Sequence, residues 1–413
     1  MRVYRLPTLT ELPDVVRGRL PPAGRVIGVD PEAAQLYITS QAGVLQSLDL
    51  ETGRTDSLVP GVAVATLGPD QTLFVVDTNR RVTTVARRAR LTWPQPLAAR
   101  PRDLFGATDQ RLVAVVPGDS TRPATVRLIT AAAGQPPAIR LLPLAGDVAA
   151  TRWGDLVAVA CDSGVLLADP MAHREPAFVP IADHPRALAF SPSGHRIYVA
   201  RRTGAGLAVI DRYDRTEVDG VALPTAVAAV RADPFGRWIL ARPSIGDSVW
   251  IVDLPIKRLL GSVATAWDAD LPAIAPDGSL LVGQGKDLVA YRPDSLRESG
   301  RVAGGSSDLW LFTTWRPRGG FRASDAIASA PVAGDSAGPD GPLYVQVSTS
   351  QNEAWSTEMA QQLSRAGLTA RVLTPRGPDD GYRVVVGPYP TRDQAEAIGR
   401  KLGRPYFIYQ PPR

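Results

Sequence analysis

The chain has 413 residues, which is long for one ordinary domain unless that domain is built from repeats. Hydrophobic residues make up 44% and charged residues 21%, so the composition is globular and excludes a disordered chain. The 46 basic residues are nearly balanced by 41 acidic ones, and no basic cluster is interleaved with aromatics, which argues against a nucleic-acid-binding protein.

The N-terminal extension, residues 1–20, lacks the apolar segment of a secretory signal peptide. No window of the chain approaches the roughly 18 apolar residues of a membrane helix, so no transmembrane segment is expected. These two absences, taken alone, indicate a cytoplasmic protein. The one cysteine, Cys161, lies in an apolar run and is interpreted as a buried strand residue. Neither a disulfide within the chain nor a cysteine zinc site is therefore expected.

A degenerate repeat fills residues 21–318. Its clearest copy is ALAFSPSGHRIYVARRTGAGLAVIDRYD, residues 187–214, in which three apolar strands alternate with turns rich in Pro, Gly and Asp. Seven copies begin near residues 26, 64, 103, 148, 187, 227 and 271. Three strands plus a fourth in the connecting stretch, at a period of about 40 to 45 residues, are typical of a propeller blade. The sequence therefore predicts a seven-bladed β-propeller, closed by an outer strand from RVYRL near the N-terminus or from DLWLFTTWRPR, residues 308–318.

These repeats resemble the YVTN type of bacterial and archaeal propeller. The resemblance is carried by SPSGHRIYVA, APDGSLLVG and DPEAAQLYIT and by the strand endings VID, IVD and SLD. WD dipeptides are absent from the expected positions, so the WD40 type fits less well. The resemblance implies the fold of this region and says little about its function.

A stretch rich in Gly, Ala, Ser, Pro and Asp, residues 319–342, is predicted to be a flexible linker. The last part of the chain, residues 343–413, changes to the order βαββαβ. Its first helix has apolar residues spaced by four, and its second is predicted to be capped by Thr391 with Gln394 and buried along Ala395, Ile398 and Leu402. The whole chain is thus expected to be multi-domain and mainly β, a propeller followed by a small α+β domain of ferredoxin-like order.

This C-terminal unit resembles a SPOR domain, a bacterial module. The resemblance rests on YVQVS (344–348), AGLTARV (366–372) and YRVVVGPYPTRDQAEA (382–397), which follow one another in the family's order. It implies binding to peptidoglycan glycan strands that lack stem peptides. It also implies a place in the periplasm or cell envelope, against the cytoplasmic interpretation of the N-terminus.

Strand alternation places Val345, Val347, Val384 and Val386 against the helices and the residues between them on the open face of the sheet. Carried over by matching position, the glycan-binding residues are Gln346, Ser348, Arg383 and Val385, together with Tyr389, the aromatic that follows Gly-Pro. Tyr389 is either a platform for a sugar ring or the residue that holds the turn. The chain departs from the family at residues 348–350, which lack the usual aromatic, and at Val385, where a polar or basic residue is common.

No catalytic motif is visible in the propeller. His173, His184 and His195 are interpreted as exposed turn residues, and no metal, cofactor or catalytic residue is expected. The leading hypothesis is a non-enzymatic cell-envelope protein whose propeller binds a protein partner, with a role in cell division or wall remodelling. Two alternatives stay open: an envelope enzyme with its active site in the propeller channel, and a cytoplasmic interaction scaffold.

Overall fold

The computed structural model separates the chain into two compact units, residues 1–318 and 319–413. The structure describes residues 2–312 and 343–410 except 13–22, 32, 87–88, 108–110, 131–137, 152–153, 171–174, 234–235, 255, 269, 276, 351–352, 366–367, 376–380, 390–394, 396–397, 400–401 and 403–405. The linker predicted over residues 319–342 lies outside the described residues. No helix within the described part has the length and hydropathy needed to span a membrane.

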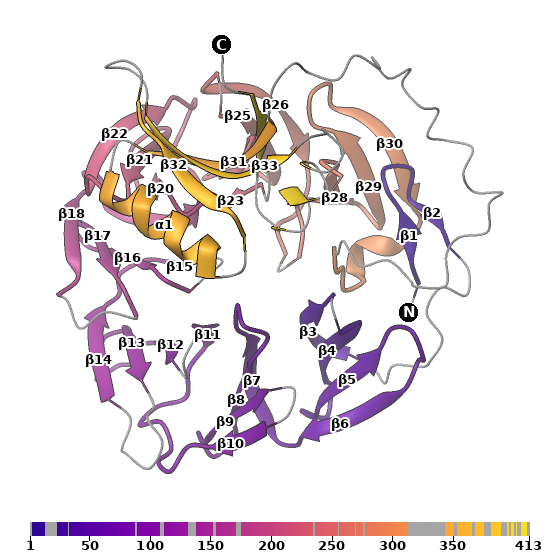
Figure 1. The fold of residues 1–413 in the computed structure, drawn as a ribbon. Helices are drawn as coiled ribbons and strands as arrows, with labels where there is room; N and C mark the ends of the chain where they lie inside the picture. The colour runs from indigo at the N-terminus through magenta and orange to yellow at the C-terminus, as the bar shows by residue number, and fades with distance from the viewer. Residues whose placement is uncertain are drawn as a thin grey trace. The chain divides into compact units, whose positions relative to one another are not determined.

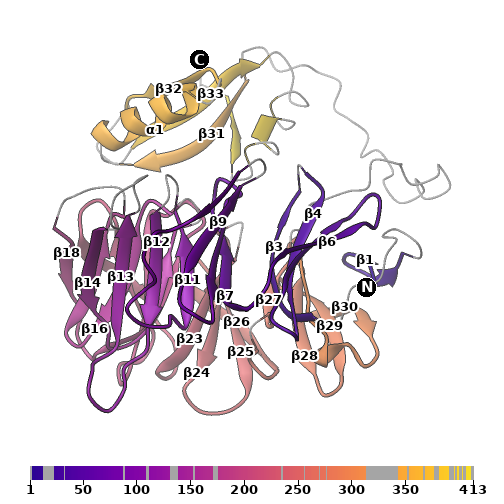
Figure 2. The ribbon, with the colours of Figure 1, turned by 90° about the horizontal axis from the view of Figure 1, so that it is seen from below.

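The first unit is a ring of seven four-stranded antiparallel sheets, each formed by four consecutive strands (Figure 1). The first strand of each sheet lies toward the centre of the ring and the fourth toward its rim, and Figure 2 shows the sheets from the side. This arrangement confirms the predicted seven-bladed β-propeller.

The strands of the first four blades are β3 (Ala23–Asp30), β4 (Gln35–Ser40), β5 (Leu45–Asp49) and β6 (Thr55–Val59); β7 (Val62–Leu67), β8 (Leu73–Asp77), β9 (Val82–Ala86) and β10 (Ala89–Thr92); β11 (Asp103–Gly106), β12 (Arg111–Val116), β13 (Thr125–Thr130) and β14 (Ala138–Pro143); and β15 (Val148–Ala150), β16 (Val157–Cys161), β17 (Gly164–Ala168) and β18 (Ala177–Pro180). Those of the last three are β19 (Pro185–Phe190), β20 (Arg196–Arg201), β21 (Leu207–Asp211) and β22 (Thr216–Val221); β23 (Val227–Ala232), β24 (Trp238–Pro243), β25 (Ser248–Asp253) and β26 (Arg258–Ala264); and β27 (Ala273–Ile274), β28 (Leu280–Gln284), β29 (Asp287–Arg292) and β30 (Arg297–Val302), followed by a short 3-10 helix, η1 (Gly305–Ser307).

The middle strands of the blades form the apolar core, because both of their faces pack against neighbouring blades. All five residues of β16 are buried, Cys161 among them as predicted. Outer strands such as β22, with the sequence TEVDGV, are polar and mostly exposed. Apolar clusters join each blade to the next, for example blades 3 and 4 and blades 4 and 5. The continuous apolar runs of the sequence therefore mark strands that are covered on both faces.

The ring closes between blades 7 and 1 without an exchanged strand. Trp310 and Phe312 pack against the core of blade 7, whereas Leu311 packs against that of blade 1. The N-terminal residues form a separate hairpin of β1 (Tyr4–Arg5) and β2 (Thr10–Glu11), which packs on blade 7. The expectation of a closing outer strand from either end is wrong, because every blade already takes its four strands in sequence.

A polar cluster around Asp211 ties together the turns of blade 5. The Asp211 carboxylate accepts hydrogen bonds from His195 Nε2 at 3.0 Å and Arg196 Nη1 at 2.5 Å, and from the backbone N–H groups of Tyr213 and Asp214. Burial raises the pKa of Asp211, but these N–H groups and the charges of His195 and Arg196 outweigh it, so that the pKa lies below its usual value. Burial lowers the pKa of His195, although Asp211 opposes that shift.

These shifts predict that acid destabilises the propeller. Because the pKa of His195 is lower in the folded chain than in the unfolded one, the unfolded state binds the extra proton as the pH falls below about 6.5. The lowered pKa of Asp211 removes further stability below about pH 4. We expect the thermal unfolding midpoint to fall between pH 7 and pH 5, and His195→Gln to flatten that part of the profile. A midpoint that rises on acidification in this range would contradict the assignment.

The second unit is an antiparallel sheet in the order β32-β33-β31-β34, with a helix packed on one face. Its elements are β31 (Leu343–Ser350), α1 (Glu353–Arg365), β32 (Ala370–Leu373), β33 (Tyr382–Tyr389) and β34 (Phe407–Tyr409). This confirms the predicted small α+β domain.

Helical packing in this unit follows the predicted spacing. Met359 and Leu363 of α1 pack into the core. Ala395 is fully buried, and Ile398 and Leu402 pack beside it, which confirms the buried stripe expected for the second helix. The expected capping residues, Thr391 and Gln394, lie outside the described residues.

Candidate glycan-binding face of the C-terminal sheet

The sheet of the second unit has one face covered by α1 and one face turned away from it. Val345 and Val347 of β31 and Val384 and Val386 of β33 share a buried cluster with Leu363 of α1. Side chains alternate along a strand, so the residues between these valines point to the other face. This second face, called here the open face, holds the candidate site.

Gln346 and Arg383 both lie on the open face, as predicted. Gln346 is directly opposite Val385 in the register of β31 and β33, and Arg383 precedes Val385 by two residues on the same strand. Both residues are half-buried. These two residues are the centre of the candidate site.

Ser348 lies on the opposite face, against the helix, so its predicted placement is wrong. The register shifts between Gln346 and Ser348, so that Ser348 rather than Val347 is opposite Val384. Such a β-bulge inserts one extra residue and breaks the strict alternation of the strand. The Ser348 hydroxyl consequently lies 3.2 Å from Sδ of Met359 in α1.

Tyr389 is also turned away from the open face. It is opposite Leu343 in the register and packs against the core that α1 covers. Burial raises the pKa of its phenol. Its ring also lies against Gly387, whose backbone φ of 130° suits only glycine. Of the two interpretations left open by the sequence, the structure favours a residue that holds the turn over a platform for sugar rings.

Val385 is on the open face but is fully buried, so it cannot touch a ligand directly. Its neighbours in the register are Gln346 on β31 and Arg371 on β32. Val385 takes no part in the helix-side cluster.

Two arginine–tyrosine pairs occupy this face, and sequence reasoning missed both. The Arg371 guanidinium lies 4.5 Å from the Tyr344 ring centre and donates a hydrogen bond to the Tyr344 hydroxyl. The Arg383 guanidinium lies 5.3 Å from the Tyr409 ring centre, with Nη1 3.4 Å from the Tyr409 hydroxyl. Stacking on an aromatic ring holds a planar guanidinium flat and in a fixed orientation.

Phe407 supplies an exposed aromatic ring beside these pairs. It is opposite Gln346 in the register of β31 and β34, and 72% of its surface is exposed. Its neighbour Ile408 packs into the core on the other face. Phe407, on the last strand, thus compensates for the aromatic that residues 348–350 lack. The alternation in PYFIYQ could have revealed that this ring points to the open face.

The open face therefore combines amide and guanidinium groups with a flat apolar ring. Guanidinium and amide N–H groups can donate to sugar hydroxyls and acetamido oxygens, and the Gln346 amide can also accept. An exposed phenylalanine offers its face to the apolar side of a sugar ring. This chemistry suits a glycan strand.

Replacing Phe407 by alanine is expected to weaken glycan binding about three- to tenfold, the loss of one aromatic contact. The matched control is Phe178→Ala, which removes a half-exposed phenylalanine from the outer strand β18 of the propeller. Titration of the full chain with soluble glycan that lacks stem peptides would measure both. Equal affinities for wild type and Phe407→Ala would exclude the ring from the site.

The described histidines of the propeller do not converge. His195 is bound to Asp211, and Nδ1 of His184 lies 2.5 Å from the carbonyl oxygen of Asp162 on the neighbouring blade. His184 is exposed as predicted, whereas His195 is half-buried, so the prediction of an exposed turn is wrong for it. His173 lies outside the described residues. Across the described part of the chain, no group of three His, Cys, Asp or Glu side chains could hold a metal ion.

The chain resembles known proteins in both units. The SPOR domain model matches residues 339–408. No curated protein matches the chain. A crystal structure of AztD from Citrobacter koseri aligns with a TM-score of 0.52 at 12% identity, over 73% of this chain and 91% of that one. Apo AztD from Citrobacter koseri gives a TM-score of 0.50 at 13% identity, over 71% and 90%.

The dihydro-heme d1 dehydrogenase NirN in complex with DHE aligns with a TM-score of 0.48 at 14% identity, over 70% of this chain and 67% of that one. Identities this low between solved structures and the chain indicate a shared fold alone. For residues 339–408, the family match, the element order and the alternation of the strands agree. The C-terminal unit that follows the seven-bladed propeller is a SPOR domain.

Proposed function

We propose that this chain is a non-enzymatic protein of the cell envelope that binds peptidoglycan through its SPOR domain. The ligand is the glycan strand stripped of its stem peptides, which presents bare sugar rings. The observation that carries the proposal is the open face, where Gln346 and Arg383 lie together beside the exposed ring of Phe407. The SPOR match supports peptidoglycan binding independently of this geometry.

In this proposal the propeller is a rigid scaffold of the YVTN type that presents a surface to a protein partner. Its blades are joined by continuous apolar clusters, which suits a rigid platform. Glycan without stem peptides arises where amidases act during cell division and wall remodelling, so the partner belongs to that process. The place of action is the periplasm.

Fractionation of cells that express the full chain from its native locus tests this placement. The chain is expected in the envelope fraction, and Arg383→Ala is expected to shift part of it to the soluble periplasmic fraction. Retention of the wild-type chain in the cytoplasm would contradict the proposal and favour an interaction scaffold inside the cell.

A further inference from the structure

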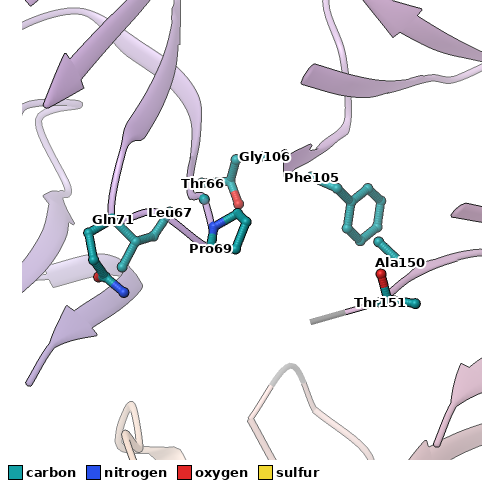
Figure 3. A pocket seen from close by; sticks show the side chains of 9 residues that line it. Thr66, Leu67, Pro69, Gln71, Phe105, Gly106, Ala150 and Thr151 are labelled. Carbon is teal, nitrogen blue, oxygen red and sulfur yellow. The ribbon is translucent and has the colours of Figure 1, made fainter. Parts of the chain in front are cut away.

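A pocket of about 330 Å³ opens where the inner strands of blades 2, 3 and 4 end. Figure 3 shows its two sides: Leu67, Pro69 and Gln71 on one, and Phe105, Ala150 and Thr151 on the other. Its volume is at the lower end of the range found for small-molecule sites. The pocket belongs entirely to the propeller and lies apart in sequence from the SPOR domain.

Gln71 occupies a backbone position that blades 4 to 7 give to glycine. The N–H of Gln71 donates to the carbonyl of the residue three before it, and the same bond recurs at Gly154, Gly194, Gly236 and Gly278 in blades 4 to 7. All five have positive φ, and that of Gln71 is 64°. A left-handed backbone suits glycine and costs free energy for glutamine. Among these five turns, only that of blade 2 has a residue with an amide side chain in this unfavourable conformation.

The amide of Gln71 is also poorly satisfied. Its Oε1 is buried and has no hydrogen-bond partner among the described residues. A buried polar atom without a partner is destabilising. Gln71 thus combines a strained backbone with an unpaired amide, and it lies on the wall of a pocket. This combination is typical of a residue that binds a ligand rather than of one that only stabilises the fold. A ligand N–H or O–H group in the pocket would give the amide its missing partner after rotation about its terminal bond.

The chemistry of the walls limits the ligand. None of the described residues that line the pocket has a charged side chain. The Thr151 hydroxyl is already engaged, because it donates to Asp155 Oδ1 at 2.5 Å. Phe105 and Leu67 provide apolar surface on opposite sides. The described walls therefore suit an uncharged molecule with one apolar face and at least one hydrogen-bond donor.

We propose that this pocket binds an uncharged acetamido sugar ring, with a ligand donor paired to Gln71 and the apolar face of the ring against Phe105. The choice of sugar rests on the proposed function, because peptidoglycan glycan consists of acetamido sugars. The chain would then hold glycan at two independent places, the open face of the SPOR domain and the pocket at the ends of the inner strands of blades 2, 3 and 4.

Saturation-transfer NMR with N-acetylglucosamine tests the pocket, using the full chain with Arg383→Ala so that the SPOR face is weakened. The sugar signal is expected to persist in that chain. Adding Gln71→Gly is expected to weaken the affinity about tenfold, as loss of a hydrogen bond does. The same change should leave the thermal midpoint unchanged or raise it by about 2 °C, because glycine relieves the strain. A purely structural role for Gln71 predicts a lower midpoint instead.

The matched control is Gly278→Gln, which puts the same side chain at the same turn of blade 7, where a Cβ meets no atom within 4 Å. It should keep the sugar signal. A signal that vanishes with Arg383→Ala alone, or that Gln71→Gly leaves intact, overturns the pocket and leaves the proposed function standing. The sugar signal could instead depend on Gln71 although the wild-type chain does not bind stripped sacculi. That result would support the pocket and contradict the proposed function.

Discussion

The chain with Arg383→Ala is expected to bind glycan that lacks stem peptides about ten- to hundredfold more weakly than the wild type. Hydrogen bonds from a charged group are worth about 1.5 to 3 kcal/mol, and the stack on Tyr409 holds the guanidinium in place before the ligand arrives. The loss of Arg383 also frees the Tyr409 ring from its partner. Titration of the full chain with soluble glycan from amidase-treated sacculi measures the effect.

Ser348→Ala is the matched control for this prediction. Ser348 was predicted to belong to the site but lies on the helix side, where its hydroxyl contacts Met359. Its removal should change the affinity for glycan less than twofold, a free-energy difference of about 0.4 kcal/mol. If Ser348→Ala weakened binding as much as Arg383→Ala, the bulge in β31 would not separate the two residues in solution.

Asp211→Ala is expected to destabilise the propeller by about 3 kcal/mol. The change leaves the backbone N–H groups of Tyr213 and Asp214 without their acceptor, His195 Nε2 without its hydrogen-bond partner and Arg196 without its anion. Removing one partner of a buried ion pair costs about 3 to 5 kcal/mol, and the partial exposure of Arg196 places the effect at the lower end. The thermal midpoint of the full chain should fall by several degrees.

The neighbouring change Asp214→Ala controls for the loss of an acidic residue in the same turn. Asp214 is exposed, and its contact with Asp211 is made by its backbone N–H, which the substitution keeps. An effect below about 0.5 kcal/mol is expected. Equal midpoints for Asp211→Ala and the wild type would show that the cluster adds nothing to stability.

Much of the fold could be predicted because its signals are local. The turn-plus-strand repeat identifies each blade by itself, and the spacing of Met359 and Leu363 identifies the buried side of α1. The closure of the ring could not be predicted in this way. It depends on Trp310, Leu311 and Phe312 packing against blades at opposite ends of the propeller sequence, and no periodicity encodes that contact.

The candidate site was predictable only while the alternation of the strands stayed regular. Gln346 and Arg383 follow the period of two, and the structure brings them to one face. Ser348 and Tyr389 follow register shifts in β31, one beside each end of the regular stretch, and both turn to the helix side. The arginine–tyrosine pairs join residues across the sheet, and their partners become neighbours only through the order β32-β33-β31-β34.

Cosedimentation of the full chain with purified sacculi, before and after amidase treatment, tests the central claim most directly. The account predicts that binding rises when the stem peptides are removed, because the open face recognises bare sugar rings, and that Arg383→Ala abolishes the rise. Binding that is absent from both materials, or that falls after amidase treatment, would contradict the claim that the open face binds stripped glycan.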